Sequence, residues 1–344
     1  MRIGKRNIGK GQSVFIVAEL SGNHNGDIKR ALRIIDAAAD AGADAIKLQT
    51  YTPDTMTIDS DTKPFQVTWK GKRRTLHDLY REAYTPWEWH AELFAHAKKR
   101  GLICFSTPFD ETAVTFLERL NVPVYKVASF EVVDIPLLEV IGKTKKPVIM
   151  SRGMATLKEL ALAVKTLRAF GTRDIILLQC VSAYPAAPED MHLANIHDLH
   201  RRFHTDIGLS DHTLGAETSI ASVALGARVI EKHLTLRRMD GGPDSAFSLE
   251  PHEFKSMVNA VRSTEKAIGA PSYTRGADES AMASFRRSLF VVRDMKKGEK
   301  FTSENLRSIR PGNGMAPKFY RTVLGKRAAR DIKRATPLRP SLIA

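Results

Sequence analysis

The sequence predicts an α/β protein, a closed TIM (β/α)8 barrel followed by a small β-rich module. Three observations carry this prediction. The chain has 344 residues, and such a barrel takes about 250, which leaves about 90 for a linker and a second module. Eight short apolar runs alternate with helical stretches, and that alternation is typical of a parallel sheet. The end of the chain loses this alternation and becomes rich in turn-forming residues.

The first predicted unit shows how the elements are assigned. Residues 14–19 are apolar and β-branched, which favours a strand. Residues 27–41 carry apolar side chains at helical spacing, and Gly42 then favours a helix end. The same criteria predict further strands at 45–49, 102–107, 124–128, 147–151, 175–179, 207–210 and 229–233, and helices at 88–100, 111–120, 136–143, 156–170, 194–202, 215–226 and 251–268.

An open, doubly wound sheet is the alternative arrangement of these units. A dinucleotide-binding sheet of that kind carries a GxGxxG turn after its first strand, and this sequence has none there. Eight units also match the number that closes a barrel. The barrel is therefore predicted over residues 1–268. A polar, irregular insertion at 52–86 follows the second strand, and long loops of this kind usually carry function or form a lid.

The end of the chain is a separate electrostatic region. Residues 269–283 are predicted to be a turn-rich linker, and residues 284–344 a small β-rich module. Residues 281–344 contain 16 Lys and Arg against four Asp and Glu, a net charge of +12 out of +15 for the whole chain. Such a charge favours an anionic partner, and a solvated basic surface is the alternative. A nucleic-acid-binding protein is a distant alternative, because no helix-turn-helix, zinc-finger or aromatic RNA-binding pattern is found.

Cysteine content and hydropathy indicate the compartment. Cys104 and Cys180 are too few for a disulfide framework or a thiolate metal cluster. No apolar run reaches the roughly 18 residues of a spanning helix, and the apolar stretch at 13–18 is too short for a secretory signal. We therefore expect a cytoplasmic protein with neither a membrane nor a nucleic acid as partner.

Polar and ionisable residues follow all eight predicted strands. In a parallel barrel the reactive side chains gather at the carboxyl ends of the strands, so these residues define a candidate site. Some of them are expected to face outward or cap helices, and Asp211 is a candidate for such a structural role. The rim residues are Glu19, Lys47, Gln49, Ser106, Thr107, Lys126, Ser129, Glu131, Ser151, Ser182, Tyr184, Ser210, Asp211, His212, Lys232 and His233.

Two histidines end neighbouring strands of the predicted barrel. His212 and His233 follow strands 7 and 8, so their imidazoles can converge. Neutral imidazoles with open positions suit a catalytic divalent metal, with substrate oxygens completing the shell. Two unrelated hydrogen-bonded histidines are the alternative. His24 is a third imidazole near the rim, with a role in a surface loop as its alternative.

Two lysines end strands 2 and 4. Lys47 and Lys126 stand beside the hydroxyl groups of Thr107, Ser129, Ser151 and Ser210. Ammonium groups and hydroxyl donors together suit a phosphate, so we predict an anion site. Salt bridges from the lysines to Glu19 or Glu131 are the alternative. Both arrangements can hold, because a carboxylate in a basic site stays ionised and can act as a base.

The motifs AELSGNHNG, IKLQTY, STPFDE, YKVASFE, GLSDHT and EKHLT resemble the sialic acid synthase family. Members of this family condense phosphoenolpyruvate with an amino sugar to make nonulosonic acids. The tail segment KGEKFTSENLRSIRPGNGM resembles the family's C-terminal antifreeze-like (SAF) domain. The resemblance covers nearly the whole chain, and the motifs are specific through their joint order and spacing.

The resemblance implies a role for each matching residue. His212 and His233 would hold Mn²⁺, or else Mg²⁺ or Co²⁺. Glu19 would contact sugar hydroxyls or the metal-linked water, and Glu131 would act near the reacting enol carbon or on the water. Asp244 would touch the sugar, and Arg310 would reach the barrel of the other protomer in a domain-swapped homodimer. Phosphoenolpyruvate would be bound by Lys47, Thr107, Lys126, Ser129, Ser151 and Ser210.

Within the family the chain looks more like the pseudaminic acid synthase branch. TLHDLYREAYTPWEWH and DGGPDSAFSLEP carry this resemblance, and Ser182 stands where the sialic acid branch often has Asn. The implied sugar is 2,4-diacetamido-2,4,6-trideoxy-L-altrose, and the implied reaction gives pseudaminic acid and phosphate with C–O cleavage. The rival is N-acetylneuraminate synthase, which acts on N-acetylmannosamine. A sugar-phosphate condensing enzyme is a more distant rival.

Two features go beyond the shared motifs. Tyr80, Tyr84, Trp87 and Trp89 lie in or just after the insertion and are candidates for packing against the deoxy face of the sugar, with ordinary helix core as the alternative. Arg152, in SRGM, departs from the commoner STGM of the family, and the resemblance assigns it no role.

Overall fold

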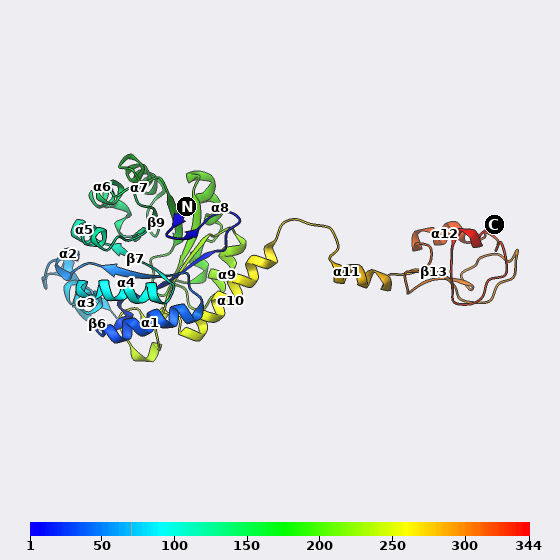
Figure 1. Ribbon diagram of the computed structural model, residues 1–344, viewed down its shortest axis with the longest axis horizontal. Coiled ribbons are helices and arrows are strands. Elements are labelled where there is room, and N and C mark those ends of the chain that lie inside the picture. The colour runs from blue at the N-terminus through cyan, green and yellow to red at the C-terminus, as the bar shows by residue number, and fades with distance from the viewer. Residues whose placement is uncertain (70) are drawn as a thin grey trace. The chain divides into compact units, whose positions relative to one another are not determined.

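The structure is a computed structural model that describes residues 1–69 and 71–344 (Figure 1). It divides into two compact units, Met1–Gly269 and Ala270–Ala344. The first is an α/β barrel and the second a small β-rich unit. The predicted fold class is therefore confirmed. Among the described residues, none of the helices combines the length and apolar character that a membrane-spanning segment requires.

Within the described part of the first unit, eight parallel strands close into a barrel in the order β10-β11-β12-β3-β4-β7-β8-β9. Closure excludes the open sheet. The strands are β3 (Phe15–Glu19), β4 (Ala45–Thr50), β7 (Ile103–Pro108), β8 (Tyr125–Val127), β9 (Val148–Ser151), β10 (Ile175–Cys180), β11 (Asp206–Asp211) and β12 (Val229–His233). A short hairpin, β1 (Arg2–Ile3) and β2 (Arg6–Asn7), precedes them.

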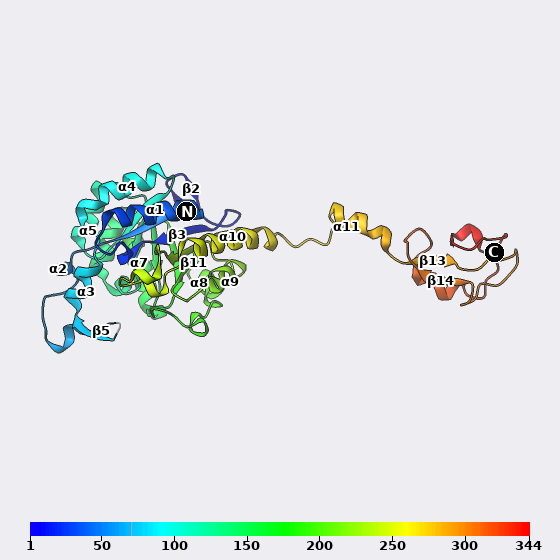
Figure 2. The ribbon, with the colours of Figure 1, turned by 90° about the horizontal axis from the view of Figure 1, so that it is seen from below.

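The helices surround the strands, as two views at right angles show (Figures 1 and 2). Their ends follow local capping rules: Asp27 accepts a hydrogen bond from the Lys29 amide at the start of α1, and Gly42 ends it at φ +87°. The helices around the barrel are α1 (Ile28–Ala41), α4 (His90–Lys99), α5 (Glu111–Arg119), α6 (Ile135–Lys143), α7 (Leu157–Ala169), α8 (Asn195–Phe203), α9 (Glu217–Ala224) and α10 (Pro251–Ile268).

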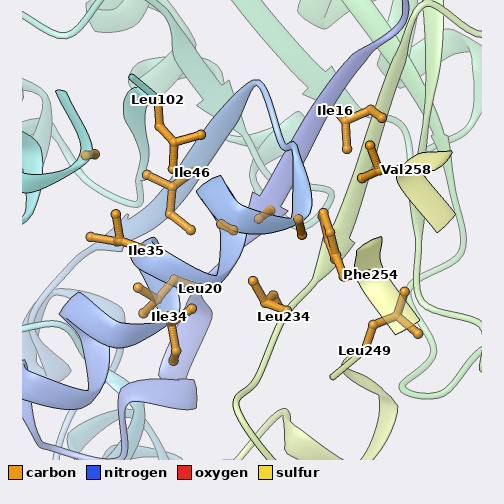
Figure 3. Packing of buried hydrophobic residues seen from close by; sticks show 14 of the residues in the cluster. Ile16, Leu20, Ile34, Ile35, Ile46, Leu102, Leu234, Leu249, Phe254 and Val258 are labelled. Atoms are coloured by element: carbon orange, nitrogen blue, oxygen red, sulfur yellow. The ribbon is translucent and has the colours of Figure 1, made fainter. Parts of the chain in front are cut away.

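The strand side chains alternate between two apolar layers. Ile16 of β3 and Ile46 of β4 point outward, where they pack with Phe254 of α10 (Figure 3). Phe15 and Val17 belong instead to a second cluster that fills the barrel interior. Because strand side chains alternate with period 2, Glu19 then also points inward, at the carboxyl end of the strand.

Strand register sets the functional side chains beside one another. His233 is paired with Glu19 across β12 and β3, and Glu19 is paired with Lys47 across β3 and β4. Gln49 is paired with Thr107 across β4 and β7. The fold therefore places residues that are far apart in sequence on one end of the barrel.

The insertion after β4 is built from regular elements, so the prediction of an irregular loop is wrong. It contains α2 (Pro53–Met56), a hairpin of β5 (Gln66–Trp69) and β6 (Lys72–Thr75), and α3 (Leu76–Ala83). Each element is short, and charged residues interrupt the apolar pattern, which hides the periodicity that longer elements show.

The second unit has a three-stranded sheet in the order β14-β13-β15. The strands are β13 (Ser288–Val291), β14 (Leu306–Ile309) and β15 (Thr336–Pro337), and the helices are α11 (Ala277–Met282) and α12 (Tyr320–Val323). Leu289, Val291, Phe301 and Leu338 belong to its own small apolar core. The predicted linker at 269–283 thus contains a helix, α11.

Candidate active site

A cavity of about 680 Å³ opens at the carboxyl ends of the barrel strands. Its volume is in the range of pockets that enclose small ligands. Apart from Arg310, all the predicted catalytic, binding and metal residues line it: Glu19, Lys47, Gln49, Thr107, Lys126, Ser129, Glu131, Ser151, Ser182, Tyr184, Ser210, His212, His233 and Asp244. Arg310 is an exposed residue of the second unit, which is described by itself.

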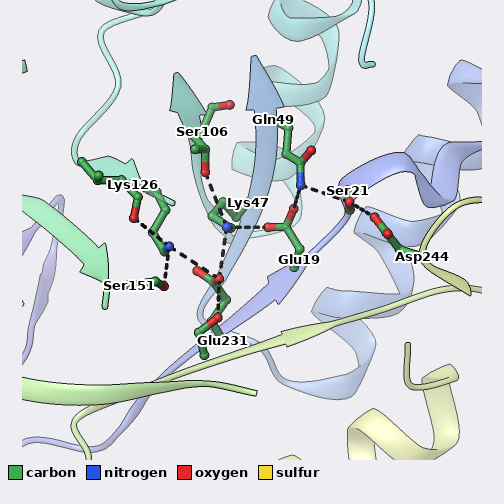
Figure 4. Close-up of polar contacts among 12 residues, drawn as sticks. Glu19, Ser21, Lys47, Gln49, Ser106, Lys126, Ser151, Glu231 and Asp244 are labelled. Carbon is green, nitrogen blue, oxygen red and sulfur yellow. Dashed lines mark hydrogen bonds and ion pairs between the residues drawn. The ribbon is translucent and has the colours of Figure 1, made fainter. Parts of the chain in front are cut away.

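A buried ionic cluster forms the floor of the cavity (Figure 4). Lys47 Nζ lies 3.0 Å from Glu19 Oε2 and 3.1 Å from Glu231 Oε1. Lys126 Nζ lies farther from a carboxylate, 3.9 Å from Glu231 Oε1, and donates a 2.7 Å hydrogen bond to Ser151 Oγ. Lys126 is thus less fully paired than Lys47, and its ammonium group is the better placed to meet an incoming anion.

Burial and neighbouring charge shift the pKa values in this cluster in opposite directions. Burial outweighs the attraction of Lys47 and raises the pKa of Glu19 to about 7. Burial would also raise the pKa of Glu231, but the two lysines outweigh it and lower that pKa. Burial lowers the pKa of Lys126 to about 8 despite Glu231, so a bound anion would stabilise its charged form.

Hydroxyl groups surround the lysines. Thr107 Oγ1 accepts from Lys47 Nζ at 3.5 Å, and Ser210 Oγ donates to Glu231 Oε1 at 3.1 Å. Ser129 and Ser182 are hydrogen-bonded to each other at 2.7 Å between their Oγ atoms. Charge and hydroxyl donors in one enclosed space are the features that a phosphate site requires.

The turn after β9 is pressed against this serine pair. Gly153 has φ +50°, and a Cβ there would lie 2.1 Å from Ser129 Cβ, so only glycine fits. The adjacent Arg152 donates to Gln179 Oε1 and to the Ala155 carbonyl, both at 3.3 Å. In this chain Arg152 therefore braces the turn that carries Gly153.

A polar chain runs from the ionic cluster to the segment that follows β12. Gln49 Nε2 donates to Glu19 Oε1 and to Ser21 Oγ, both at 3.1 Å. Ser21 in turn donates to Asp244 Oδ2 (Figure 4). Ser21 is a contact that the sequence reasoning missed, although it opens the polar loop after β3.

The two predicted metal-ligand histidines lie side by side. Their ring centroids are 5.3 Å apart, and the Phe247 ring packs 4.9 Å from His233. His212 Nδ1 donates to the Val181 carbonyl at 2.8 Å, which leaves Nε2 with a free lone pair. Burial lowers the pKa of His212 to about 4 and that of His233 well below its usual value, so both imidazoles are neutral.

This donor set fits a divalent metal with two protein ligands. Among the described residues, none makes a hydrogen bond to the buried His233 Nδ1. Neutral, oriented imidazoles beside an ionic pocket are the donors that a catalytic cation uses when substrate oxygens complete its shell. Residues 1–69 and 71–344 hold no group of three or more His, Cys, Asp or Glu side chains suited to a metal ion.

Other rim residues have structural roles. Lys232 and Asp211 form a 3.0 Å ion pair, with both side chains fully buried, and Asp211 also accepts from Ser219 and Thr218. Asp211 thus has the structural role that the sequence suggested for it, and Lys232 does not line the cavity. His24 is buried, accepts from the Gly26 amide and contacts Thr85, so it is not a surface-loop residue.

The aromatic candidates of the insertion separate into two groups. Tyr80 lines the cavity. Trp87 instead stacks on Phe116 with ring centroids 4.7 Å apart, and Trp89 packs against the core of α1. Tyr84 and the two tryptophans do not line the cavity, and Trp89 follows the core alternative.

Glu231 is the main residue that the sequence reasoning missed. It lines the cavity and bridges the two lysines. The alternation of β12 carries the signal for it, because a strand that points His233 inward also points residue 231 inward and residue 232 outward.

Comparison with known proteins gives the family. The NeuB family model matches residues 34–273 and the SAF domain model residues 286–344. The chain is 46% identical over 99% of both sequences to a Campylobacter jejuni protein named pseudaminic acid synthase. It is 36% identical, over 94% of this chain and 98% of the other, to a C. jejuni protein named N,N'-diacetyllegionaminic acid synthase.

A solved structure agrees with these matches. The N-acetylneuraminic acid (sialic acid) synthetase from Leptospira borgpetersenii aligns with a TM-score of 0.73 at 34% identity, over 82% of this chain and 94% of that one. The chain belongs to the NeuB family of synthases and carries a SAF domain at its C-terminal end.

Proposed function

We propose that the protein condenses phosphoenolpyruvate with 2,4-diacetamido-2,4,6-trideoxy-L-altrose, giving pseudaminic acid and inorganic phosphate. This proposal rests on one observation: a lysine–hydroxyl anion site and a pair of neutral histidines line the same cavity. The first suits the phosphate and carboxylate of phosphoenolpyruvate, and the second suits the aldehyde end of an open-chain sugar.

The proposed chemistry forms one C–C bond and breaks one C–O bond. The enol methylene carbon attacks the sugar aldehyde carbon, so negative charge moves to the aldehyde oxygen and positive charge develops on the pyruvyl carbon. Water adds to that carbon, and the bond from the carbon to the bridging oxygen then breaks, which releases phosphate. The two protons of the water balance those taken up by the new hydroxyl and by the phosphate.

Four residues have roles in these reaction steps. Lys126 and Lys47 offset the charge of the phosphate and carboxylate groups. Glu131 is the proposed base for the attacking water; burial outweighs the effect of Lys126 and raises its pKa to about 7, which suits proton transfer near neutral pH. Glu19, held by Lys47 and Gln49, is proposed to contact the sugar hydroxyls.

His212 and His233 are the proposed ligands of a divalent cation, Mn²⁺ in the first instance. When bound, such a cation supplies positive charge to polarise the aldehyde oxygen. The Val181 carbonyl fixes the His212 ring for this purpose, and Phe247 limits the movement of His233.

The choice of sugar rests on the relatives. The relative named pseudaminic acid synthase is 46% identical to this chain, against 36% for the one named N,N'-diacetyllegionaminic acid synthase and 34% for the N-acetylneuraminic acid synthetase of L. borgpetersenii. Ser182 also places a small hydroxyl beside Ser129 at the cavity wall. Both points favour the altrose-derived sugar over N-acetylmannosamine.

A substrate panel tests the proposal. Phosphate release and product mass would be measured with phosphoenolpyruvate, Mn²⁺ and either the altrose-derived sugar or N-acetylmannosamine. We expect turnover of the first sugar, with a product mass equal to sugar plus pyruvate. Equal or better turnover of N-acetylmannosamine would overturn the choice of sugar, and turnover of neither would overturn the proposed function.

A further inference from the structure

The cavity has a second, apolar wall that the proposed chemistry does not use. The insertion supplies it through Met56 of α2 and Leu79, Tyr80 and Ala83 of α3, all of which line the cavity. The Tyr51 ring, at the end of β4, continues this wall with edge contacts to Tyr80 at 5.8 Å and Phe109 at 5.2 Å between centroids. Nonpolar side chains in an enclosed pocket select for apolar ligand groups.

The wall is fixed in place against the barrel. A Cβ at Gly22 would lie 3.2 Å from the Cα of Ala83, so this glycine allows α3 to pack directly on the loop after β3. The chain that follows α3 is also anchored, because Trp87 Nε1 donates to the Tyr51 carbonyl at 3.0 Å and Thr85 contacts His24. A wall held this tightly has the rigidity that shape selection needs.

Topology places the wall away from the histidine pair. His233 ends β12, and in the barrel β12 is followed by β3, then by β4, from which the insertion departs. The reacting aldehyde must lie near the enol carbon and the histidines. The other end of a six-carbon open-chain sugar therefore extends toward a different sector of the mouth.

We infer that Met56, Leu79 and Tyr80 form the subsite for the methyl end of the sugar and select a 6-deoxy substrate over its 6-hydroxy counterpart. The inference rests on the proposed function and adds residues that determine specificity. A hydroxymethyl group packed against the side chains of Met56 and Leu79 would give up hydrogen bonds to water that these side chains cannot replace, which costs binding energy in the transition state.

Two substrates and three variants test the inference. The ratio of kcat/KM for 2,4-diacetamido-2,4,6-trideoxy-L-altrose to that for its 6-hydroxy counterpart would be measured in the wild type, Leu79→Asn, Met56→Gln and Leu76→Asn. Leu76 is the matched control, since it begins the same helix without lining the cavity. We expect a wild-type preference of about a hundredfold for the 6-deoxy sugar, and at least a tenfold smaller preference in Leu79→Asn and Met56→Gln.

The KM for phosphoenolpyruvate is the internal control for an intact site, and it should stay unchanged in all three variants. Leu76→Asn should also keep the wild-type preference. If the wild type turns over the 6-deoxy sugar and both wall variants keep its preference, the wall assignment is wrong while the proposed function stands. If the wild type turns over neither sugar, the proposed function itself fails, and the assignment fails with it.

Discussion

His212 and His233 are the residues on which the proposed chemistry depends most directly. Both are neutral, and the carbonyl of Val181 fixes the ring of His212. We expect His233→Ala to cost at least about 3 kcal/mol in the activation barrier, roughly a hundredfold in kcat. Phosphate release would be measured before and after chelation, and added Mn²⁺ should restore the chelated wild type only. Full wild-type turnover in metal-free buffer would refute the metal role.

The raised pKa of Glu131 predicts how turnover depends on pH. Burial raises its pKa to about 7, with Lys126 partly opposing the shift. A base must be ionised to accept a proton from water, so kcat should rise with pH up to about 7 and level off above it. Glu131→Gln should remove this rising limb and lower kcat by about a hundredfold.

Glu19→Gln is the control for the pH profile, because the pKa of Glu19 is also raised to about 7 by burial. If Glu19 contacts the sugar and Glu131 is the base, the Glu19 variant keeps the rising limb. If the rising limb of the pH profile remains in Glu131→Gln and disappears in Glu19→Gln, then Glu19 is the base and Glu131 contacts the sugar.

Individual residues also show how far the sequence alone can lead. Strand ends and residue type were sufficient to predict thirteen side chains that line one cavity, whereas Asp244 was indicated only by the family resemblance. Glu231 lies two residues before the end of β12 and so is not a strand-end residue, but the period-2 alternation of the strand brings it to the same face as His233. Contacts such as Ser21 with Asp244 join segments more than 200 residues apart, and local sequence carries no signal for that distance.

At the scale of elements, the close contact between α6 and α7 requires a residue without a Cβ at position 142, which can be tested. In an isolated helix, Ala is more favourable than Gly by about 1 kcal/mol. Here a Cβ would lie 2.6 Å from Phe170 Cβ, just after α7, and 3.2 Å from the Leu167 carbonyl oxygen, and overpacking of this kind typically costs about 1–3 kcal/mol.

We therefore expect Gly142→Ala to lower the free energy of unfolding by up to about 2 kcal/mol, since the steric cost exceeds the gain in helix propensity. Urea unfolding monitored by circular dichroism would measure the difference. An increase in stability would mean that α6 and α7 can move apart at little cost.

Elements with a clear apolar pattern were predictable, including the three-residue β8 and the four-residue β9, whereas the elements of the insertion were not. The eight strands and eight surrounding helices follow clear periodicities, and their number implied closure. The insertion was not predicted, because charged residues interrupt the apolar pattern of α2, β5, β6 and α3, which span four to eight residues each. Elements so short depend on tertiary contacts, such as that of Ala83 with Gly22, more than on their own propensity.

At the scale of the whole molecule, the predicted contribution of the second unit to a partner's barrel rests on Arg310. It is exposed and follows β14 directly. The loop after it is pinned to β13, because Ser288 Oγ donates to the Pro311 carbonyl at 2.6 Å and accepts from the Gly314 amide at 2.8 Å. The fold of this unit thus holds Arg310 on a fixed loop.

We expect Arg310→Ala to raise the KM for the sugar more than the KM for phosphoenolpyruvate. Arg321→Ala, which removes another exposed charge from the same unit, should change neither. Steady-state kinetics with each substrate varied in turn would measure both constants. A larger effect on phosphoenolpyruvate would remove the second unit from the sugar site.

In the proposed reaction, this cavity joins phosphoenolpyruvate to a sugar with cleavage of the C–O bond. The most direct measurement uses phosphoenolpyruvate labelled with ¹⁸O in the bridging oxygen, turned over with the altrose-derived sugar, followed by mass spectrometry of the released phosphate. With C–O cleavage, the phosphate carries the label and the nine-carbon product does not. Unlabelled phosphate, with the label retained in the product, would mean P–O cleavage and would contradict the proposed reaction.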